Sequence, residues 1–597
     1  MIRVADYIAD FIFKQGVRDI FLVSGGGIMF LTDGLAKNKG LKFICNHHEQ
    51  ASAMAAVAYA KYTNNLGVAY ITTGCGGTNA MTGLLNGWQD SIPCLFISGQ
   101  VKRANTTRNS GLKLRQFGVQ EADIIQLVEP LTKYAVMVNE PEKIAYHLEK
   151  AVYLAKSGRP GPVWLDIPLD VQGAMVDESK LTRFNPTDEM MDIKKSLTNE
   201  ELSELQALLD KSERPIIVAG QGIRLSETIN TFRDFVKSHN IPVVSSYLGV
   251  GVLPTNDDHY IGCIGAKGTR AGNFAIQNSD LVLVLGSHLS VSSIGYEAKK
   301  FARDAKVIVV DIDSVEHRKD LVRIDFFINI ELKEFFNHAV KLKIANDKNW
   351  LDKCRRWKLM WPVCLPEYAL EDKVNLYYFV DRLSKKMPAD AVVISDAGSA
   401  FYATTQAINL KSGQRYITSG GQAEMGYTTP ACIGVSVARK GREVLGITGD
   451  GSFQMNIQEM QTIIYNKLPI KLFVWNNNGY LSIRATQSKF FEQRLVGTDS
   501  SSGVSFPNLK KVADCYGLKY FIINNSSEVD SVIDQILAYD GPVLCEVMCN
   551  SAQEIKPTIS SVRKEDGSMV SRPMEDMYPF LPREEFLDEM IIEPLEE

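Results

Sequence analysis

The stretch GDGSFQMNIQEMQTIIYNKLPIKLFVWNNNGY, residues 449–480, decides the fold of this chain. An apolar run leads into its first glycine, a helical stretch follows, and a second apolar run, KLFVWNNN (471–478), ends in asparagines. This order is that of a βαβ unit, in which both strands end at the same edge of a parallel sheet, where doubly wound folds bind ligands. We therefore expect Asp450 and Asn477 to face one crevice.

The oxygen atoms at this edge suit a magnesium ion. Mg²⁺ requires oxygen ligands in near-octahedral geometry and usually takes one or two of them from the protein and the others from phosphate and water. The carboxylate of Asp450, the amide oxygen of Asn477 and the carbonyl of Gly479, together with a diphosphate, meet this requirement. The sequence therefore predicts a magnesium and diphosphate site here.

Glycines and a helix N-terminus complete the predicted site. Gly449 and Gly451 let the backbone approach a phosphate closely, and the helix that starts after Ser452 offers unpaired N–H groups. Taken alone, G-D-G is more often an ordinary turn. Its place between an apolar strand and a helix, with Asn-Asn closing the next strand, favours the ligand site.

The same alternation of apolar runs and helical stretches extends along the whole chain. The predicted strands are 19–23, 67–73, 93–99, 162–168, 215–220, 242–246, 281–287, 306–314, 391–398, 443–450, 471–478 and 542–548. Two polar passages, 177–200 and 346–361, are expected to be linkers. The pattern predicts an α/β fold of three consecutive doubly wound parallel-sheet domains.

The linkers set the expected domain boundaries. The three domains are expected at 1–178, 195–343 and 370–552, and residues 553–597 are expected to form a C-terminal tail that covers the active site. The length of 597 residues agrees with about three domains.

Composition excludes several classes of function. The net charge of -5 argues against nucleic acid or an anionic membrane as the main partner. The 10 cysteines include no C-x-x-C pair and have no His-rich neighbourhood, which argues against a zinc site and favours reduced thiols. The N-terminal stretch has no signal-peptide core, and no apolar run reaches membrane-spanning length, so we expect a cytoplasmic protein.

The G-D-G and N-N pair, with residues 452–475 between its two parts, resembles the cofactor signature of thiamine-diphosphate enzymes. The segment NHHEQASAMAAVAYAKY (46–62) is similar to the H-E-Q-x-A segment of the acetolactate synthase group, and the likeness continues over nearly the whole chain. The resemblance implies thiamine diphosphate and Mg²⁺ as cofactors. It also implies a pyrimidine-binding, a central and a diphosphate-binding domain, in that order.

Glu49 is the one acidic residue of this segment, and it begins an alanine-rich helix that we expect to be buried on several sides. A glutamate at a helix N-terminus is also favoured by the helix dipole alone. The resemblance gives Glu49 the role of the glutamate that relays a proton to the pyrimidine ring of the cofactor. A carboxyl group in apolar surroundings can share a proton with a ring nitrogen.

Other segments carry further residues of the implied site. Residues 72–101 look like the pyrimidine-binding segment of these enzymes, and 117–124 look like the active-site loop that follows it. Residues 418–434 resemble the loop whose methionine wedges the two cofactor rings apart, although a methionine is more often core filler. The resemblance implies Glu49, Gln120 and Met425 as catalytic residues, and Gly74, Asn79, Gly398, Ser399, Gly449, Gly451, Ser452 and Met425 as cofactor-binding residues.

In this family the glutamate and the metal site come from different subunits. The resemblance therefore implies a homodimer or homotetramer with active sites at the interface. A non-catalytic relative, kept as a binding or regulatory subunit, is an alternative class. The complete set of Glu49, Met425, Asp450 and Asn477 argues against it, because a degenerate relative is expected to lose such a residue.

The cofactor implies decarboxylation of a 2-oxo acid, with pyruvate as the expected donor, and transfer of a two-carbon unit to a carbonyl acceptor. In acetolactate synthases an arginine holds the carboxylate of the acceptor and a tryptophan shapes its pocket. Here His288 or Ser290 stands where arginines are expected, and Thr486 stands in place of the tryptophan. Lys267, Arg270 or Arg484 remains as another source of a cation.

Further departures point to a different acceptor. Cys75 replaces a proline of the family, Leu169 replaces a lysine, and the chain ends in the tail SRPMEDMYPFLPREEF (571–586). These features resemble synthase-like enzymes of surface-polysaccharide and branched-sugar pathways, which implies a keto sugar nucleotide as acceptor. Acetolactate synthase is the first alternative. A decarboxylase without an acceptor, or a cyclic diketone hydrolase, is the second.

A flavin is the third cofactor to consider. The segments 219–223, 265–272 and 310–316 resemble the region that carries a non-redox FAD in acetolactate synthases. The same glycine turns also fit plain connections of an α/β domain, and G-x-G-x-x-G is absent. Both interpretations stay open at this point.

Overall fold

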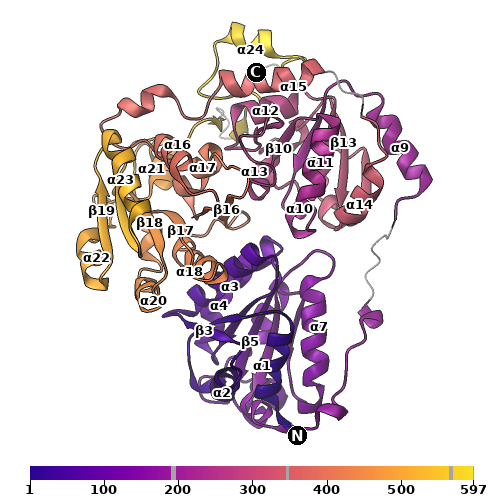
Figure 1. Cartoon of the computed structure of the whole chain (residues 1–597), viewed down its shortest axis with the longest axis vertical. Coiled ribbons are helices and arrows are strands. Elements are labelled where there is room, and N and C mark those ends of the chain that lie inside the picture. Colours follow the sequence, from indigo (N-terminus) through magenta and orange to yellow (C-terminus); the bar gives the residue numbers. More distant parts are fainter. Residues whose placement is uncertain (190–195, 345–347, 564–568, 596–597) are drawn as a thin grey trace.

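Three α/β domains follow one another along the chain in the computed structural model, which describes residues 1–189, 196–344, 348–563 and 569–595 (Figure 1). Each domain contains a six-stranded parallel sheet with helices between its strands. The predicted fold class is confirmed.

The first and third domains have the same strand order. The first sheet runs β3 (Lys42–Cys45), β2 (Asp19–Leu22), β4 (Gly67–Ile71), β5 (Cys94–Gln100), β7 (Val163–Pro168) and β6 (Tyr134–Met137). The third runs β16 (Arg415–Thr418), β15 (Val392–Ser395), β17 (Val444–Gly449), β18 (Ile470–Asn476), β20 (Val543–Met548) and β19 (Lys519–Ile523). Counted along the chain, both orders are 2-1-3-4-6-5, so the two outer domains share one topology.

The central domain is connected differently. Its sheet runs β11 (Tyr260–Cys263), β10 (Val243–Ser245), β9 (Pro215–Ala219), β12 (Leu281–Leu285), β13 (Lys306–Asp311) and β14 (Phe326–Asn329). The order 3-2-1-4-5-6 is that of a dinucleotide-binding fold, in which the strand order reverses beside the first strand.

The prediction that residues 346–361 form a linker is wrong for the part of this stretch that the structure describes. Residues Lys348–Met360 form helix α15, which packs against α12 (Arg270–Gln277) of the central domain. Trp350, Cys354 and Trp357 are buried at a spacing of three to four residues, so they form one apolar side of the helix. The basic residues that suggested a linker lie between these apolar positions. The expected first linker is 177–200. Its residues 190–195 lie outside the described residues, and its last two residues already belong to α9 (Asn199–Leu209).

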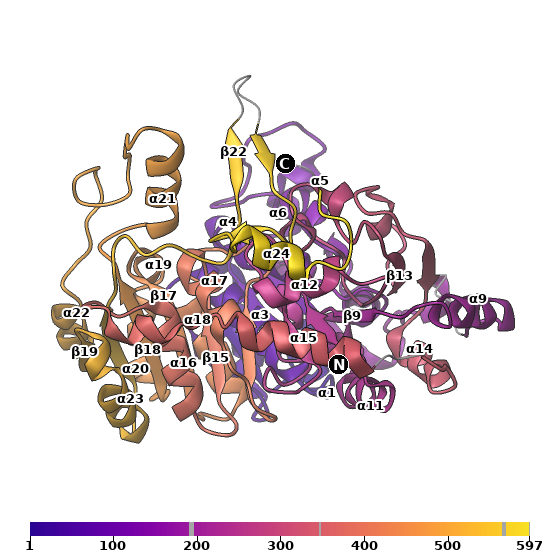
Figure 2. The ribbon, with the colours of Figure 1, turned by 90° about the horizontal axis from the view of Figure 1, so that it is seen from above.

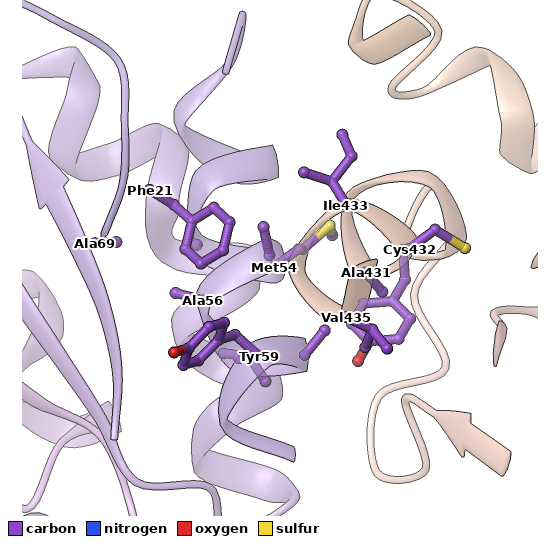
Figure 3. Close-up of a cluster of buried hydrophobic side chains, with 14 of the residues drawn as sticks. Phe21, Met54, Ala56, Tyr59, Ala69, Ala431, Cys432, Ile433 and Val435 are labelled. Carbon is purple, nitrogen blue, oxygen red and sulfur yellow. The ribbon is translucent and has the colours of Figure 1, made fainter. Parts of the chain in front are cut away.

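One pair of helices joins the first domain to the third. α3 (Glu49–Thr63) packs along α18 (Thr428–Ala438), and nearly every residue of both helices is buried. Figure 3 shows Met54 of α3 and Ile433 of α18 in one apolar cluster. Gly434 allows this approach, because a Cβ there would collide with the carbonyl oxygen of Ala55. The two domains therefore share a continuous core.

The described part of the tail packs on the central domain. Its strands β21 (Thr558–Ile559) and β24 (Met577–Tyr578) pair, and α24 (Arg583–Glu589) lies across α12 and α15 (Figure 2). The rings of Phe586 and Phe274 are 5.9 Å apart, and the indole of Trp357 donates a 2.7 Å hydrogen bond to Glu589. The role of an active-site cover stays a prediction. None of the described helices combines the length and the apolar character needed to cross a bilayer.

Candidate functional site

Asp450 and Asn477 meet at the carboxyl edge of the third sheet. Asp450 follows β17 directly, Asn477 follows β18, and the two strands pair in parallel. The Oδ2 atom of Asp450 accepts hydrogen bonds of 3.1 Å from the backbone N–H groups of Asn477 and Gly479. Asp450 and Asn477 therefore lie next to each other at this edge, and a shared crevice stays a prediction.

The donor atoms at this edge fit magnesium better than a softer metal. Asp450 is 2% exposed, and burial raises the pKa of its carboxyl group to about 6, against the effect of backbone N–H groups. Within the described ranges, no group of three or more His, Cys, Asp or Glu side chains is placed to hold a metal ion. A cation here would depend on one carboxylate with amide and carbonyl oxygens, the hard ligands that Mg²⁺ prefers.

Packing explains why two of the positions at this edge are glycine, and a third glycine borders open space. A Cβ at Gly451 would collide with the ring of Tyr480. Gly479 has a φ of +154°, and a Cβ there would collide with the carbonyl oxygen of Thr498. A Cβ at Gly449 would meet nothing within 4 Å, so a ligand can approach the backbone from this side.

Asp396 is a site residue that the sequence analysis missed. It follows β15, is fully buried, and accepts hydrogen bonds from Ser452 Oγ (2.5 Å) and Thr448 Oγ1 (2.9 Å). Ser452 Oγ in turn accepts from the N–H of Gly426, 2.7 Å away. Asp396 therefore ties together the loops that carry the predicted cofactor residues. Its position at the end of a predicted strand was the available signal.

The remaining predicted residues of this domain lie around Asp396. Gly398, with a φ of +58°, and Ser399 begin α17 (Gly398–Ala407), two residues after Asp396. Met425 precedes Gly426 in the loop between β16 and α18, and its side chain is only partly buried. Partial burial argues against core filler and agrees with a side chain that contacts a ligand.

The residue before this methionine was also missed. Glu424 is buried, and its Oε1 accepts a 2.5 Å hydrogen bond from Asn86 of the first domain. It also hydrogen-bonds to Ser419, and burial raises the pKa of its carboxyl group to about 7. In the sequence, Glu424 stands out as a charged residue in a loop of small residues, and this was the available signal.

A second group of predicted residues gathers in the first domain. Glu49 is 8% exposed, and its Oε2 accepts a 3.0 Å hydrogen bond from Asn79 Nδ2 in α4 (Cys75–Gln89). Gly74, with a φ of +73°, precedes α4, and a Cβ there would collide with the carbonyl oxygen of Gln120. Glu49, Gly74, Asn79 and Gln120 therefore lie around the N-terminal end of α4.

Within one chain the two groups are linked only indirectly among the described residues, through the hydrogen bond from Asn86 of α4 to Glu424 and through Asn456, which donates to Gln50 and to Gly426 O. None of the hydrogen bonds and ion pairs between described residues links Glu49 to Asp450 or to its neighbours. The start of α3 instead contacts other residues of the third domain. Asn46 donates to Glu459 over 2.9 Å, and Asn456 donates to Gln50 over 3.1 Å. The structure thus brings the predicted residues together as two separate groups.

The residues at the family's acceptor positions have local partners. His288 lies 3.7 Å from Glu316, Ser290 Oγ is 2.8 Å from Ser292 Oγ, and Thr486 Oγ1 donates to the carbonyl of Ser482 in α21 (Leu481–Phe490).

Two of the other cations considered are also engaged. The guanidinium of Arg270 donates to the carbonyl oxygens of Met577 and Pro579 in the tail. That of Arg484 donates to the carbonyl oxygens of Asn477 and Ser551, at 3.1 and 2.7 Å.

Packing explains the glycine turns of the central domain. A Cβ at Gly220 would collide with the carbonyl oxygen of Gly286, and one at Gly222 would lie 2.7 Å from the Cα of Gly286. A Cβ at Gly268 would lie 2.6 Å from the carbonyl oxygen of Cys263. These contacts account for the glycines without a ligand, so the turns by themselves do not indicate a flavin.

Each domain matches a family of known proteins. Residues 2–135 match "Thiamine pyrophosphate enzyme, N-terminal TPP binding domain", residues 202–337 match the central domain of these enzymes, and residues 396–547 match "Thiamine pyrophosphate enzyme, C-terminal TPP binding domain".

Similar proteins span almost the whole chain. The acetolactate synthase large subunit of Lactococcus lactis subsp. lactis (strain IL1403) is 32% identical over 548 residues, which cover 92% of each chain. The acetolactate synthase isozyme 2 large subunit of Escherichia coli (strain K12) is 30% identical over 557 residues, which cover 93% of this chain and 97% of the relative.

Proposed function

Because this chain belongs to the thiamine pyrophosphate (thiamine diphosphate) enzymes of the acetolactate synthase type, we propose that it decarboxylates pyruvate and joins the remaining two-carbon unit to a carbonyl acceptor. The observation that carries this proposal is the meeting of Asp450 with Asn477 and Gly479 in the domain that matches the C-terminal TPP-binding family.

The third domain offers the residues that would hold the cofactor's diphosphate. Asp450, Asn477 and the carbonyl of Gly479 would hold Mg²⁺, and the open side of Gly449 admits a phosphate. Thiamine diphosphate, when bound, supplies the carbanion chemistry by which a 2-oxo acid loses carbon dioxide. Met425, in the loop fixed through Ser452, would contact its rings.

Glu49 would hold a proton at the other end of the cofactor. Its hydrogen bond from Asn79 fixes the Oε2 atom, and Oε1 would be the atom that serves the pyrimidine ring of a bound cofactor. A Cβ at Gly76 would lie 3.3 Å from Oε1, so a side chain at this position would crowd the carboxyl group. These contacts support a role in proton relay.

The proposed reaction moves one acetyl unit. The bond between C1 and C2 of pyruvate breaks, and C1 leaves as carbon dioxide. A new bond joins C2 to the carbonyl carbon of the acceptor, whose oxygen takes one proton from solvent. The product is a 2-hydroxy ketone, and no oxidant or reductant is required.

A keto sugar nucleotide is the acceptor that we favour. The stretch 285–293 carries no arginine, and His288 within it is beside Glu316. Burying an acceptor carboxylate without a charged, bidentate partner is costly. Thr486 stands where the family has a tryptophan. The large apolar side chain is therefore missing, and a hydroxyl that can hydrogen-bond to a polyol is present.

Acetolactate synthase is the second candidate. The names of the relatives in Lactococcus lactis and Escherichia coli, at 32% and 30% identity, favour it. In that case the acceptor is a second 2-oxo acid.

We further propose that the active site forms between two copies of the chain. No described hydrogen bond or ion pair joins Glu49 directly to Asp450 within one chain. A second copy that brings its Glu49 group to the Asp450 group would complete the site. The partners would be small molecules and this second copy.

FAD is a proposal that rests on the resemblance of the central domain alone. Packing explains the glycine turns at Gly220 and Gly268, so those residues add no support. Flavin fluorescence in the supernatant of heat-denatured enzyme measures it directly. If the supernatant of fully active enzyme shows no flavin fluorescence, FAD is not part of the proposal.

The acceptor panel is the deciding experiment for the function. The enzyme, with thiamine diphosphate and Mg²⁺, receives pyruvate alone, pyruvate with 2-oxobutyrate, and pyruvate with a 4-keto-6-deoxy sugar nucleotide. Product mass is the readout. We expect the sugar to gain one acetyl unit with a higher kcat/KM than acetolactate formation. Efficient acetolactate formation without sugar turnover would establish the second candidate, and carbon dioxide release without any ligation product would contradict both.

A further inference from the structure

One lysine lies beside α17, the helix that begins with the predicted cofactor-binding residues Gly398 and Ser399, and no described carboxylate forms an ion pair with it. Lys267 lies in the loop 265–268 of the central domain, and its Nζ lies 4.1 Å from the ring centroid of Tyr402. Tyr402 belongs to α17, whose first residue is Gly398. Because residues four apart lie on the same side of a helix, Tyr402 stands one turn from Gly398, a predicted cofactor-binding residue, and Lys267 lies against Tyr402.

The backbone of this loop is fixed on several sides. The N–H of Ala266 donates to Ser292 O (2.8 Å), the N–H of Lys267 donates to Tyr247 Oη (3.1 Å), and Gly268 O accepts from Gln406 Nε2 (3.0 Å). These hydrogen bonds fix the backbone at Lys267, and the contact of its Nζ with the ring of Tyr402 limits where the amino group lies. Such a preorganised cation loses little further freedom when it binds an anion.

The charge of this lysine is uncompensated. In the parts of the chain that are described, no carboxylate forms an ion pair with Lys267, and its only aromatic partner is Tyr402. Burial lowers the pKa of its ammonium group to about 8. Arg270 and Arg484 are engaged by backbone carbonyl oxygens, so Lys267 is the one of the three considered cations that is left for a ligand.

We propose that Lys267 binds the anionic group of the acceptor, either the carboxylate of a second 2-oxo acid or the diphosphate of a nucleotide-linked keto sugar. This inference rests on the proposed carboligase function. A partly desolvated ammonium over an aromatic ring gains from an anion a charge-assisted hydrogen bond that the ring does not supply. Lys267 thereby selects charged acceptors over neutral ones and takes no part in decarboxylation.

The test separates charged from neutral acceptors. Lys267→Met and Lys267→Arg are assayed with 2-oxobutyrate, with a nucleotide-linked keto sugar and with neutral benzaldehyde. We expect Lys267→Met to raise KM for the anionic acceptor that the enzyme uses by about 10- to 100-fold. KM for benzaldehyde and carbon dioxide release from pyruvate should stay unchanged, and Lys267→Arg should restore most of the loss. The anionic acceptor whose KM rises in Lys267→Met shows whether Lys267 binds a carboxylate or a diphosphate.

Lys358 provides a matched control. Burial also lowers its pKa to about 8, and it also lies over a tyrosine ring, 5.5 Å from the centroid of Tyr260. Its Nζ donates to the carbonyl oxygens of Thr255 and Tyr260, so it has partners that Lys267 lacks. We expect Lys358→Met to leave KM for every acceptor unchanged.

Three results would overturn the inference. Equal changes of KM for charged and neutral acceptors in Lys267→Met, or no change for any acceptor while ligation proceeds, contradict it and leave the proposed function intact. A wild-type enzyme that releases carbon dioxide but joins no acceptor overturns the proposed function and the inference with it. Met is expected to fold well here, because it removes a buried charge and packs on an aromatic ring.

Discussion

At the scale of single residues, one buried carboxylate organises the third domain. Asp396 accepts hydrogen bonds from Ser452, Thr448 and the N–H of Ala397, so it joins chain segments that follow or end different strands. Asp450 stands next to this network and directs its own oxygens to backbone N–H groups. The proposed metal ligand Asp450 is thus held by hydrogen bonds within the protein that do not depend on a metal.

Removal of a metal ligand should therefore affect binding more than folding. We expect Asp450→Ala and Asn477→Ala to weaken thiamine diphosphate binding in Mg²⁺ by at least the 10- to 100-fold that loss of an outer-shell partner costs. Titration calorimetry or tryptophan quenching measures the affinity. Asn478→Gly, at an exposed neighbour with a φ of 57°, is the control. Wild-type affinity in both alanine variants would contradict the metal assignment.

Glu424 should make stability depend on pH. Burial raises the pKa of Glu424 to about 7 from 4.5, so between these values the folded chain binds a proton that the unfolded chain has lost. Stability should therefore fall as pH rises through this window, by up to about 3 kcal/mol. Glu424→Gln keeps the hydrogen bond from Asn86 but cannot titrate.

Urea unfolding at pH 5 and pH 7.5 measures this effect. The wild type should lose more stability between the two values than Glu424→Gln does. Equal losses in the two proteins would show that another group causes the pH dependence.

The candidate site could be predicted where local sequence rules apply. Asp450 and Asn477 meet because parallel strands end at one edge, which a single βαβ stretch reveals. The same rule points to the position of Asp396 after β15 but not to its partners, and it does not point to Glu424. Their roles come from hydrogen bonds to distant segments, Asp396 to Ser452 and Glu424 to Asn86, and no spacing along the chain encodes such contacts.

At the scale of elements, the inner strands of each sheet could be predicted from the sequence and the outer strands could not. Each of the three large sheets has six strands, of which four were predicted, and the six strands missed in these sheets are their edge strands. They are β3, β6, β11, β14, β16 and β19. An inner strand of a parallel sheet is buried on both faces and reads as a continuous apolar run. Edge strands such as β3, KFIC, and β19, KYFII, are partly exposed and carry charged residues.

The contact between α3 and α18 can be tested at its closest point. We expect Gly434→Val to destabilise the protein by about 1–3 kcal/mol or more, because the added side chain meets the backbone of Ala55 and forces the helices apart. Chemical unfolding provides the measurement. Ala438→Val adds the same two methyl groups at a partly buried position of α18 and should cost less. A fully stable Gly434→Val protein would mean that the helices can separate freely.

At the scale of the whole molecule, the outer domains share a strand order and each carries one group of predicted site residues. Glu49 lies in the first, and Asp450 lies in the third. The shared core of α3 and α18 fixes the orientation of these domains within one chain. A closed twofold dimer would then contain two equivalent sites, each built from both copies.

Mixing two inactive variants tests this arrangement. Glu49→Gln should bind thiamine diphosphate without turning over, and Asp450→Ala should fail to bind it. If each site takes Glu49 from one copy and Asp450 from the other, a mixed dimer contains one intact site. Coexpression of the two variants should then restore about a quarter of wild-type activity for random pairing in dimers. Size-exclusion chromatography with light scattering verifies the mixed species, and no restored activity in it would contradict a shared site.

The burial of α3 has a consequence for synthesis in the cell. This helix, rich in alanine and enclosed on nearly every side, is finished by residue 63, whereas α18, which covers it, begins at residue 428. At typical elongation rates the ribosome needs on the order of tens of seconds to make the chain between them. During that time the nascent first domain exposes an apolar surface, so its yield should depend on chaperones and on the speed of translation more than the final stability of the enzyme would indicate.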